Sequence, residues 1–534
     1  MGIAEGMVAI PYENTYGEYS RTYQFLKYYL WTGSCANVTC PSAMTDGAAR
    51  LLSIQLDCPE EAMDFSRVTL QKAYEHLTSR DPKQAWTSGQ WMTERIGGSN
   101  VRNLETVAHL SPLLENEREA IDSDENILGP WVLDGFKWFS SATDASMAII
   151  LAKTSEKELS IFYAPLRRKA RVAYNDLNTP KEVLNGIAIQ RLKSKLGTRP
   201  LPTAELSLRG TRAHLIGKKG QGSKEMSTVL NITRIHNAVT ACGFLGRGIA
   251  ISRAFTRVRR VRGTLLMDIP AHIRTLAALH VEHHAYMQLT FFVVTLLGMV
   301  ESENGRGKPT TPNQTKGQIP YLKGCDDVGI LLRILTPVTK ALTAKASVSG
   351  LAECMESLGG IGYLDSSSAS DMETNIARLY RDANVLSIWE GTTQVMAEDA
   401  VRVLKGPLST QALDQLDKWV KTQLQQASEC IPSLTSGRIE ETWNNLCNYI
   451  RLMNTEHLVI VGRDIAQQLG WIICAVLLYG DIRQGGDETS RLVAERWTEK
   501  RQHRTLAHTN ITELVAQDKI LAFGQEKPTR DAKL

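Results

Sequence analysis

The chain has 534 residues, of which 43 % are hydrophobic and 22 % charged, and its formal net charge is +4. A chain of this length allows two to four domains, and the composition excludes an intrinsically disordered or collagen-like protein. The small positive charge, spread over so many residues, does not predict nucleic-acid binding.

The first part of the chain changes from helical to β periodicity. Apolar residues recur at spacings of three and four along residues 19–77, which is typical of amphipathic helices. Between residues 88 and 216 short β-rich runs are separated by Gly, Pro, Asp and Asn. We therefore predict a short helical domain over residues 1–87 and a compact antiparallel β domain over residues 88–220.

Helical spacing returns after residue 221 and continues almost to the end. The predicted helices cover residues 226–258, 269–301, 327–357, 393–404 and, as a last helical region, 409–517. Residues 302–324 are predicted to form a surface loop. We expect a helical domain over residues 221–405 and a helical extension with a targeting tail over residues 406–534. Because no βαβ alternation occurs, the fold class is mainly α with a central antiparallel β domain.

Several local patterns are interpreted as structural. The glycine-rich residues 217–222 do not match a phosphate-binding loop, because Ser223 precedes Lys224, and they are read as a turn that opens a helix. Three glycines in the following helix are expected to permit close packing, namely Gly243, Gly246 and Gly248. The longest mainly apolar run, residues 285–300, is shorter than the ~20 residues of a bilayer span, so no membrane span is predicted.

The histidines, arginines and cysteines give only weak indications of metal, phosphate or disulfide sites. His280 and His284 share one helical face, which favours a polar face or a subunit interface, and no metal site is predicted. The basic residues 257–262 suit either phosphate groups or a solvated face. The nine cysteines lack paired spacings and are predicted to be reduced thiols.

Two segments are hard to explain by packing alone. Residues 91–100 place hydroxyl groups and a Gly-Gly turn beside Trp91, which suits an anionic or heteroaromatic ligand. Glu390 directly follows Ile388 and Trp389, and apolar surroundings would raise the pKa of its carboxyl group toward that of a useful general base. Alternatively, Glu390 lies near the start of the next helix, where the helix dipole favours a carboxylate.

At these two segments the sequence resembles the acyl-CoA dehydrogenase family of FAD flavoproteins, and within it the AidB-type branch. Residues 137–141, 356–363 and 259–263 resemble, in the same order, the flavin contact of the β domain, a glycine turn and an arginine motif of that family. The resemblance implies a helical, β, helical architecture in a homo-oligomer, together with a C-terminal helical extension. Arg262 departs from it, because the family usually has an aromatic residue there.

The resemblance also assigns site residues. It implies that Glu390 is the catalytic base and that Arg234 lies near its carboxylate. The residues implied to bind FAD are Thr93, Ser99, Trp138, Ser140, Arg259, Gly359, Gly360, Thr392 and Gln394. The helical region before residue 93 is shorter than in the family. A shorter region would weaken the retention of the flavin.

The expected function is FAD-dependent α,β-dehydrogenation of an acyl-CoA thioester, in fatty-acyl or secondary-metabolite (toxin) biosynthesis. The electron acceptor is left open between an electron-transfer flavoprotein and oxygen, and oxygen would make the protein an acyl-CoA oxidase. Two alternatives remain, a flavin-bearing AidB-like binding or protective protein with little dehydrogenase activity, and a flavin-free helical scaffold.

The last three residues, Ala532, Lys533 and Leu534, are a one-step variant of the Ser-Lys-Leu peroxisomal address. They predict recognition by the peroxisomal import receptor. Met1 to Pro11 show no secretory signal. We therefore expect a peroxisomal protein, of fungal type by its resemblance.

Overall fold

A computed structural model describes most of the chain as two compact units. The described residues are 1–58, 67–98, 101–113, 121–170, 181–303, 327–365, 374–499 and 511–524. The first unit comprises residues 1–13 and 35–233, and the second comprises residues 14–34 and 234–534. The predicted N-terminal helical domain is thus shared between the two units. Most of the predicted loop at 302–324, and the tail residues 532–534, lie outside the described residues.

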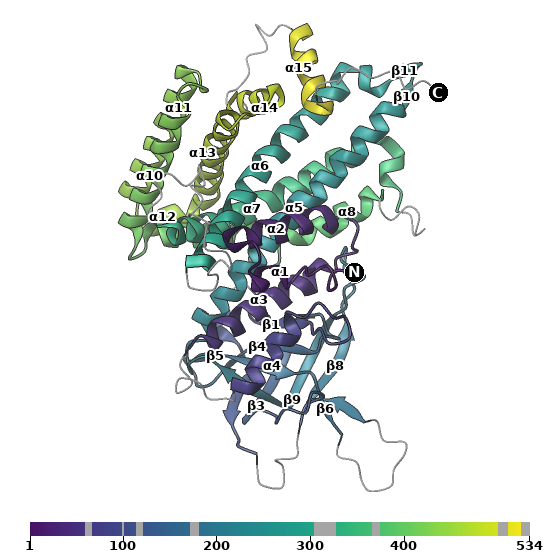
Figure 1. Cartoon of the computed structure of the whole chain (residues 1–534), viewed down its shortest axis with the longest axis vertical. Helices are drawn as coiled ribbons and strands as arrows, with labels where there is room; N and C mark the ends of the chain where they lie inside the picture. Colours follow the sequence, from purple (N-terminus) through teal and green to yellow (C-terminus); the bar gives the residue numbers. More distant parts are fainter. Residues whose placement is uncertain are drawn as a thin grey trace. The chain divides into compact units, whose positions relative to one another are not determined.

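A seven-stranded sheet forms the centre of the first unit (Figure 1). Its strands are β1 (Ser88–Trp91), β2 (Val107–Leu110), β3 (Trp131–Ser141), β4 (Met147–Lys153), β5 (Leu159–Pro165), β8 (Ile187–Leu192) and β9 (Thr203–Ile216). Most neighbours are antiparallel, but β4 pairs in parallel with both β1 and β2. The predicted central β domain is confirmed, but its sheet is mixed where the sequence predicted antiparallel pairing. Hydrophobic alternation reports which face of a strand is buried, and it carries no information on the direction of its neighbour.

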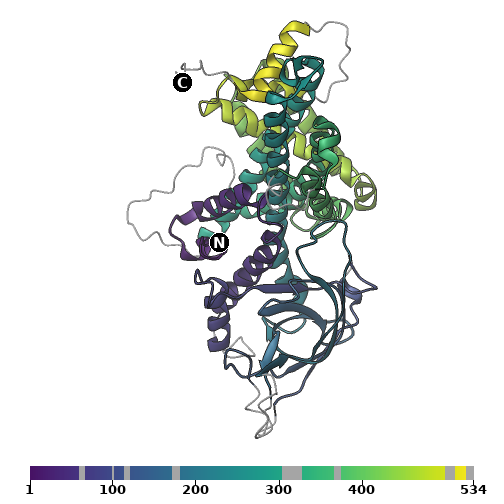
Figure 2. The same cartoon turned by 90° about the vertical axis from the view of Figure 1, so that its right-hand side faces the viewer.

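Strand β4 shows how the first unit is packed. Met147 and Ile149 face a core that also holds apolar residues of α3 (Thr39–Leu56) and α4 (Arg67–Leu77). The alternate residue Ile150 faces a second core inside the curled sheet. Figure 2 shows α3 and α4 beside the sheet. Because β4 is buried on both faces, its sequence is a continuous apolar run.

Helices make up most of the second unit. Its first part contains α2 (Ser20–Thr32), α6 (Pro270–Glu303), α7 (Val328–Ser357), α8 (Ile376–Ala383), α9 (Thr393–Lys405) and most of α5 (Gly222–Val258). Its extension contains α10 (Ser409–Gln426), α11 (Ser433–Leu452), α12 (Thr455–Ile460), α13 (Gly462–Arg483), α14 (Glu488–Glu499) and α15 (Ile511–Phe523). Helix α6 packs along α7 (Figure 1). Helix α7 in turn packs on α9. The helical regions predicted after residue 221 are confirmed within the described residues.

The glycine interpretations are also confirmed. Helix α5 begins at Gly222, directly after a turn in which Gly217 has a positive φ of 68°. Within α5, a Cβ atom on Gly243 would lie 2.8 Å from the carbonyl oxygen of Tyr29 in α2. A larger residue at position 243 would therefore separate these two helices.

Two helices require a correction to the membrane argument. Residues 270–302 and Gly462–Arg483 are each long and apolar enough, by length and composition alone, to cross a membrane. In α13, 72 % of the apolar window is buried inside the protein, whereas in α6 the figure is 50 %. Both helices pack against other helices of the second unit, so a core role accounts for their hydropathy.

The eight described cysteines are free thiols, as predicted, and Cys325 lies outside the described residues. Burial raises the pKa of Cys242 and of Cys354 to about 12. Both thiols therefore remain protonated and unreactive at neutral pH.

Candidate functional site

Glu390 lies in a strained turn of the second unit. The turn joins the short 3-10 helix Asn384–Ser387 to α9, and Thr392 caps α9 by accepting a hydrogen bond from the backbone of Val395. Glu390 has a left-handed φ of 57°, and the next residue, Gly391, has a φ of 102°. For a residue with a side chain, this conformation costs about 1–3 kcal/mol, so the surroundings must hold it in place.

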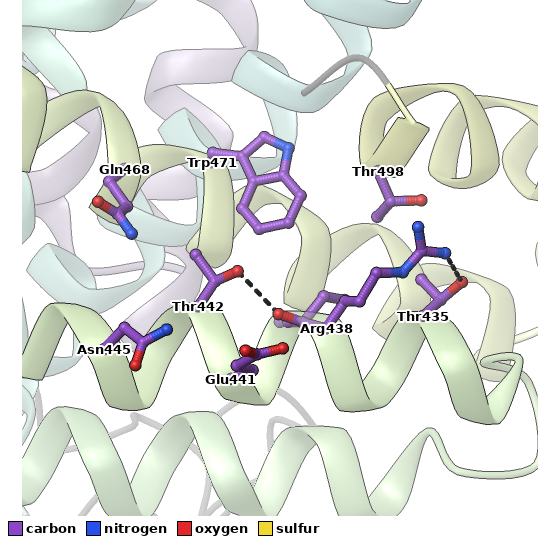
Figure 3. A pocket seen from close by; sticks show the side chains of 9 residues that line it. Thr435, Arg438, Glu441, Thr442, Asn445, Gln468, Trp471 and Thr498 are labelled. Carbon is purple, nitrogen blue, oxygen red and sulfur yellow. Dashed lines mark hydrogen bonds between the residues drawn. The ribbon is translucent and has the colours of Figure 1, made fainter. Parts of the chain in front are cut away.

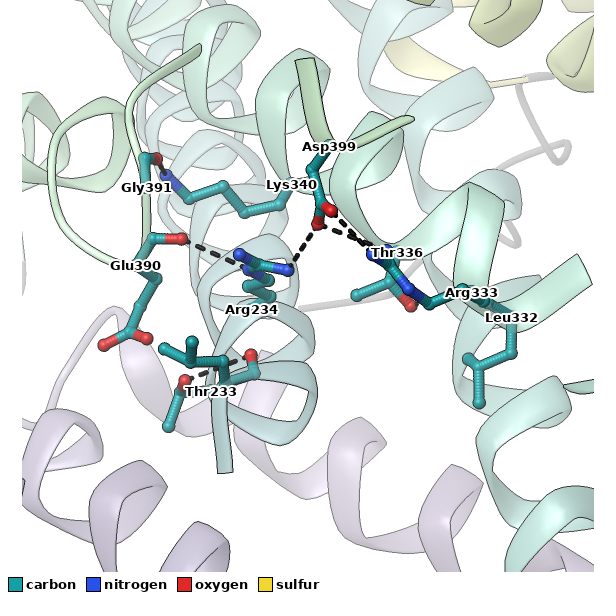
Figure 4. A network of polar contacts seen from close by, with 10 residues as sticks. Thr233, Arg234, Leu332, Arg333, Thr336, Lys340, Glu390, Gly391 and Asp399 are labelled. Atoms are coloured by element: carbon teal, nitrogen blue, oxygen red, sulfur yellow. Dashed lines mark hydrogen bonds and ion pairs between the residues drawn. The ribbon is translucent and has the colours of Figure 1, made fainter. Parts of the chain in front are cut away.

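Two cationic side chains hold this turn through its backbone. Nζ of Lys340 in α7 donates hydrogen bonds to the carbonyl oxygens of Trp389, at 2.7 Å, and of Gly391. Nε of Arg234 in α5 donates to the carbonyl oxygen of Glu390 at 3.3 Å. Three consecutive carbonyl groups are thus bound. Figure 4 shows that the Glu390 carbonyl points toward Arg234, whereas its carboxylate points the other way.

Asp399 in α9 links this arrangement to α7. It accepts a hydrogen bond from Nη1 of Arg234 at 2.9 Å and from Nη2 of Arg333 at 2.6 Å (Figure 4). Burial acts to raise the pKa of Asp399, but the two guanidinium groups outweigh it and hold the pKa below its ordinary value. The carboxylate therefore stays charged, and it fixes the guanidinium group of Arg234 beside the turn.

The immediate surroundings of Glu390 are only partly shielded from solvent. Glu390 and Trp389 are half-buried, and Ile388 is 62 % exposed. Arg234, which the resemblance places near the carboxylate of Glu390, donates to the backbone carbonyl of Glu390 and to the carboxylate of Asp399. Burial lowers the pKa of the Arg234 guanidinium. The negative charge of the Glu390 carboxylate acts in the opposite direction and raises this pKa, but its effect is smaller than that of burial.

The first unit brings two other predicted residues together. The backbone N–H of Trp138 in β3 donates to the carbonyl oxygen of Thr93 at 2.9 Å. Their neighbours Lys137 and Glu94 form a fully buried ion pair at 2.7 Å. Burial lowers the pKa of Lys137 to about 8, with Glu94 acting in the opposite direction. The sequence analysis did not identify this pair, although both residues lie next to assigned ones.

The surface around Trp138 suits an anionic aromatic ligand. Nζ of Lys193 lies 3.0 Å from the centroid of the Trp138 ring, and the guanidinium carbon of Arg95 lies 4.8 Å from it. Two residues further along β3, the hydroxyl of Ser140 is buried and has no hydrogen-bond partner among the described residues. A flavin nucleotide combines a heteroaromatic ring that could accept such a hydrogen bond with negative phosphate groups, so these residues fit FAD.

The other assigned residues are dispersed over the second unit. Arg259 is exposed and directly precedes a hairpin formed by β10 (Arg260–Val261) and β11 (Thr264–Leu265). Arg262 lies at the tip of this hairpin with a left-handed φ of 51°. Gly359 and Gly360 are exposed at the start of a 3-10 helix.

Gln394, at the start of α9, donates to the carbonyl oxygen of Val459 at 3.4 Å and accepts from Arg463 at 3.2 Å. Ser99 lies outside the described residues. Over the part of the chain that the structure describes, no three His, Cys, Asp or Glu residues gather into a metal site.

A pocket in the C-terminal extension contains none of the assigned residues. It has a volume of about 370 Å³ and lies between α11, α13 and the end of α14. Arg438 and Trp471 line it together with several polar side chains (Figure 3). The pocket is thus formed by other helices than those that hold the Glu390 turn.

Comparison with known proteins places these features in one family. Residues 89–211 match the family description "Acyl-CoA dehydrogenase, middle domain", and residues 322–405 match "Acyl-CoA dehydrogenase, C-terminal domain". The crystal structure of Caenorhabditis elegans ACDH-11 in complex with C11-CoA is 30 % identical and has a TM-score of 0.77. The match covers 98 % of this chain and 82 % of that one.

Two curated relatives match over less of their own length. Acyl-CoA dehydrogenase family member 11 of Caenorhabditis elegans is 37 % identical over 75 % of this chain, and AidB of Escherichia coli is 28 % identical over 69 %. In both cases the match covers 58 % of the relative. The chain therefore spans somewhat more than half the length of these relatives.

Proposed function

Since the chain belongs to the acyl-CoA dehydrogenase family, we propose that it binds FAD and introduces an α,β double bond into an acyl-CoA thioester, with Glu390 as the base. FAD is the cofactor of this family, in agreement with the cofactor that the resemblance implied. The similarity to a structure that holds C11-CoA supports an acyl-CoA as the substrate class. The observation that carries the proposal is the Glu390 turn, in which hydrogen bonds to three consecutive carbonyl groups fix the backbone of the residue that carries the carboxylate.

The chemistry requires a fixed base. An α C–H bond next to a thioester is only weakly acidic, so a carboxylate must be held close to it while negative charge develops on the thioester oxygen. Glu390 would take the α-proton onto its carboxylate. Its backbone is fixed by Lys340 and Arg234, so little reorganisation is needed at that step.

The cofactor supplies the hydride acceptor for the β-carbon. In the first unit, Thr93, Trp138 and Ser140 would hold its ring, with Lys193 available for a negative group. In the second unit the resemblance assigns Arg259, Thr392 and Gln394 to the dinucleotide portion, and it assigns Gly359 and Gly360 of the glycine turn to FAD binding. The resemblance also assigns Ser99 to FAD binding, together with Thr93, Trp138 and Ser140.

Anaerobic mixing with acyl-CoA tests the proposal. The FAD-loaded protein is mixed with saturated acyl-CoA thioesters of increasing chain length, including C11-CoA, and the flavin absorbance is followed. We expect bleaching with at least one thioester. Glu390→Gln should retain the flavin spectrum and slow bleaching by about 10²–10⁴-fold, the usual contribution of a general base.

The same experiment separates the alternatives. If no thioester bleaches the flavin, the protein is a flavin-bearing binding protein of the AidB kind, and purification without a flavin spectrum would indicate a scaffold. Admitting oxygen after bleaching distinguishes the electron acceptors, because rapid recovery of absorbance with release of peroxide indicates an oxidase. Slow recovery indicates a protein acceptor such as an electron-transfer flavoprotein.

The proposed location is the peroxisome, in fatty-acyl or secondary metabolism. It is supported by the final residues Ala532, Lys533 and Leu534. A fluorescent fusion at the N-terminus should enter peroxisomes, and deletion of residues 532–534 should leave it outside them.

A further inference from the structure

Lys340 is an unusual residue for the middle of a core helix. It lies in α7, and its side chain is completely buried. Burial of an ammonium group is costly unless hydrogen bonds compensate for the lost water. Over the described part of the chain Lys340 forms no ion pair, and its hydrogen bonds go to the carbonyl oxygens of Trp389 and Gly391, the two neighbours of Glu390.

This geometry is suited to holding a strained turn. The left-handed backbone of Glu390 is unfavourable, and a turn that relaxed would move the carboxylate together with the backbone. Lys340 binds the carbonyl on each side of that residue, whereas Arg234 binds the carbonyl of Glu390 itself. Without Lys340 the carbonyl groups of Trp389 and Gly391 would lose this donor, whereas the bond from Arg234 to the carbonyl group of Glu390 would remain.

Both protonation states of Lys340 have enough N–H groups for these two hydrogen bonds, although the charged form donates more strongly. Burial lowers its pKa to about 7, while the Glu390 carboxylate acts to raise it. A neutral amine still has two N–H groups, which is the number that the two carbonyl groups require. Lys340 can therefore hold the turn in either protonation state.

We propose that Lys340 is a positioning residue for Glu390, acting through the backbone of residues 389–391 and without contact to substrate or cofactor. The inference rests on the proposed function, in which Glu390 is the base. Because a displacement of about 1 Å at a reacting group can slow a reaction about 100-fold, loss of this support should slow the chemical step more than substrate binding.

Lys340→Met tests the inference, because methionine keeps much of the side-chain length but has no donor. The FAD-loaded full chain is mixed anaerobically with C11-CoA, and the maximal rate of flavin reduction and the half-saturating concentration are measured. We expect the rate to fall about 10- to 100-fold, and the half-saturating concentration to change less than about threefold. Lys345→Met is the matched control, since Lys345 is exposed on the same helix, and it should behave like the parent.

Glu390→Gln, measured in parallel, separates the two proposals. If it blocks reduction while Lys340→Met reduces the flavin at the parent rate, the role of Lys340 is refuted and the proposed function stands. If Glu390→Gln reduces the flavin as fast as the parent, the proposed function fails and this inference fails with it. Should the methionine variant not fold with FAD, Lys340→Leu is measured instead. Leucine is smaller and also has no donor, so an unchanged rate would again contradict the inference.

Discussion

Gly391 has a φ of 102°, a backbone conformation that residues with side chains rarely adopt. A Cβ atom there would clash only with the flexible end of Met396, so the backbone conformation is the main obstacle to a larger residue. We expect Gly391→Ala to lower the free energy of unfolding by about 1–3 kcal/mol, measured by urea titration of the full chain.

Gly437 offers a control, because its substitution by alanine should change the free energy of unfolding in the opposite direction. It is exposed within α11, and a Cβ atom there would meet nothing within 4 Å. Gly437→Ala should therefore raise the stability by about 0.5–1 kcal/mol, because alanine loses less backbone entropy in a helix. Equal effects of the two substitutions would contradict the strain assigned to the Glu390 turn.

Single residues differ in how far the sequence reveals them. Glu390 could be selected because it stands in a recognisable motif with Trp389 and Gly391. Lys340 could not, because about 50 residues separate it from the turn and nothing around it in sequence distinguishes it from other helical lysines. The same holds for the buried pair of Glu94 and Lys137, since only the folded sheet shows that their side chains meet.

Helix α6 carries histidines that burial keeps neutral. Burial lowers the pKa of His283 to about 4 and that of His280 to about 3, and His284 is lowered as well. Nε2 of His283 also donates a hydrogen bond to the carbonyl oxygen of Cys242 at 3.2 Å. The predicted polar helix face is thus largely covered, and its imidazoles contribute to packing as uncharged groups.

These histidines make stability depend on pH. Below the ordinary histidine pKa of about 6.5 the unfolded chain binds protons that the folded protein does not, so stability falls as the pH decreases toward about 4. His283→Gln should reduce the slope of this fall by about 1.4 kcal/mol per pH unit. Urea titrations between pH 6.5 and 4.5 measure it, and parallel slopes for parent and variant would contradict the assigned pKa.

At the level of elements, periodicity predicted helices well and strand direction poorly. The helices α5, α6, α7 and α9 begin and end close to the predicted residues, because a spacing of three and four over many turns is specific. The parallel pairing of β4 with β1 depends on how the chain returns to the sheet after β3, which no local pattern records.

At the scale of the whole molecule, the sequence predicted the order of helical and β regions but not how they group. The segment 14–34 belongs with the distant helices of the second unit, where Arg21 in α2 pairs with Glu301 in α6 at 2.7 Å. This ion pair joins residues far apart in sequence, so only the folded chain reveals it. Likewise, the apolar composition of α6 and α13 is explained by packing that a hydropathy profile does not contain.

The central claim is that the carboxylate of Glu390 removes the α-proton of a bound acyl-CoA. Incubation of the FAD-loaded protein with C11-CoA in deuterium oxide, without an electron acceptor, measures this step through incorporation of deuterium at the α-carbon, detected by mass spectrometry. The account predicts exchange by the parent and a loss of about 10²–10⁴-fold in Glu390→Gln at equal flavin content. Exchange at the parent rate in that variant would contradict it.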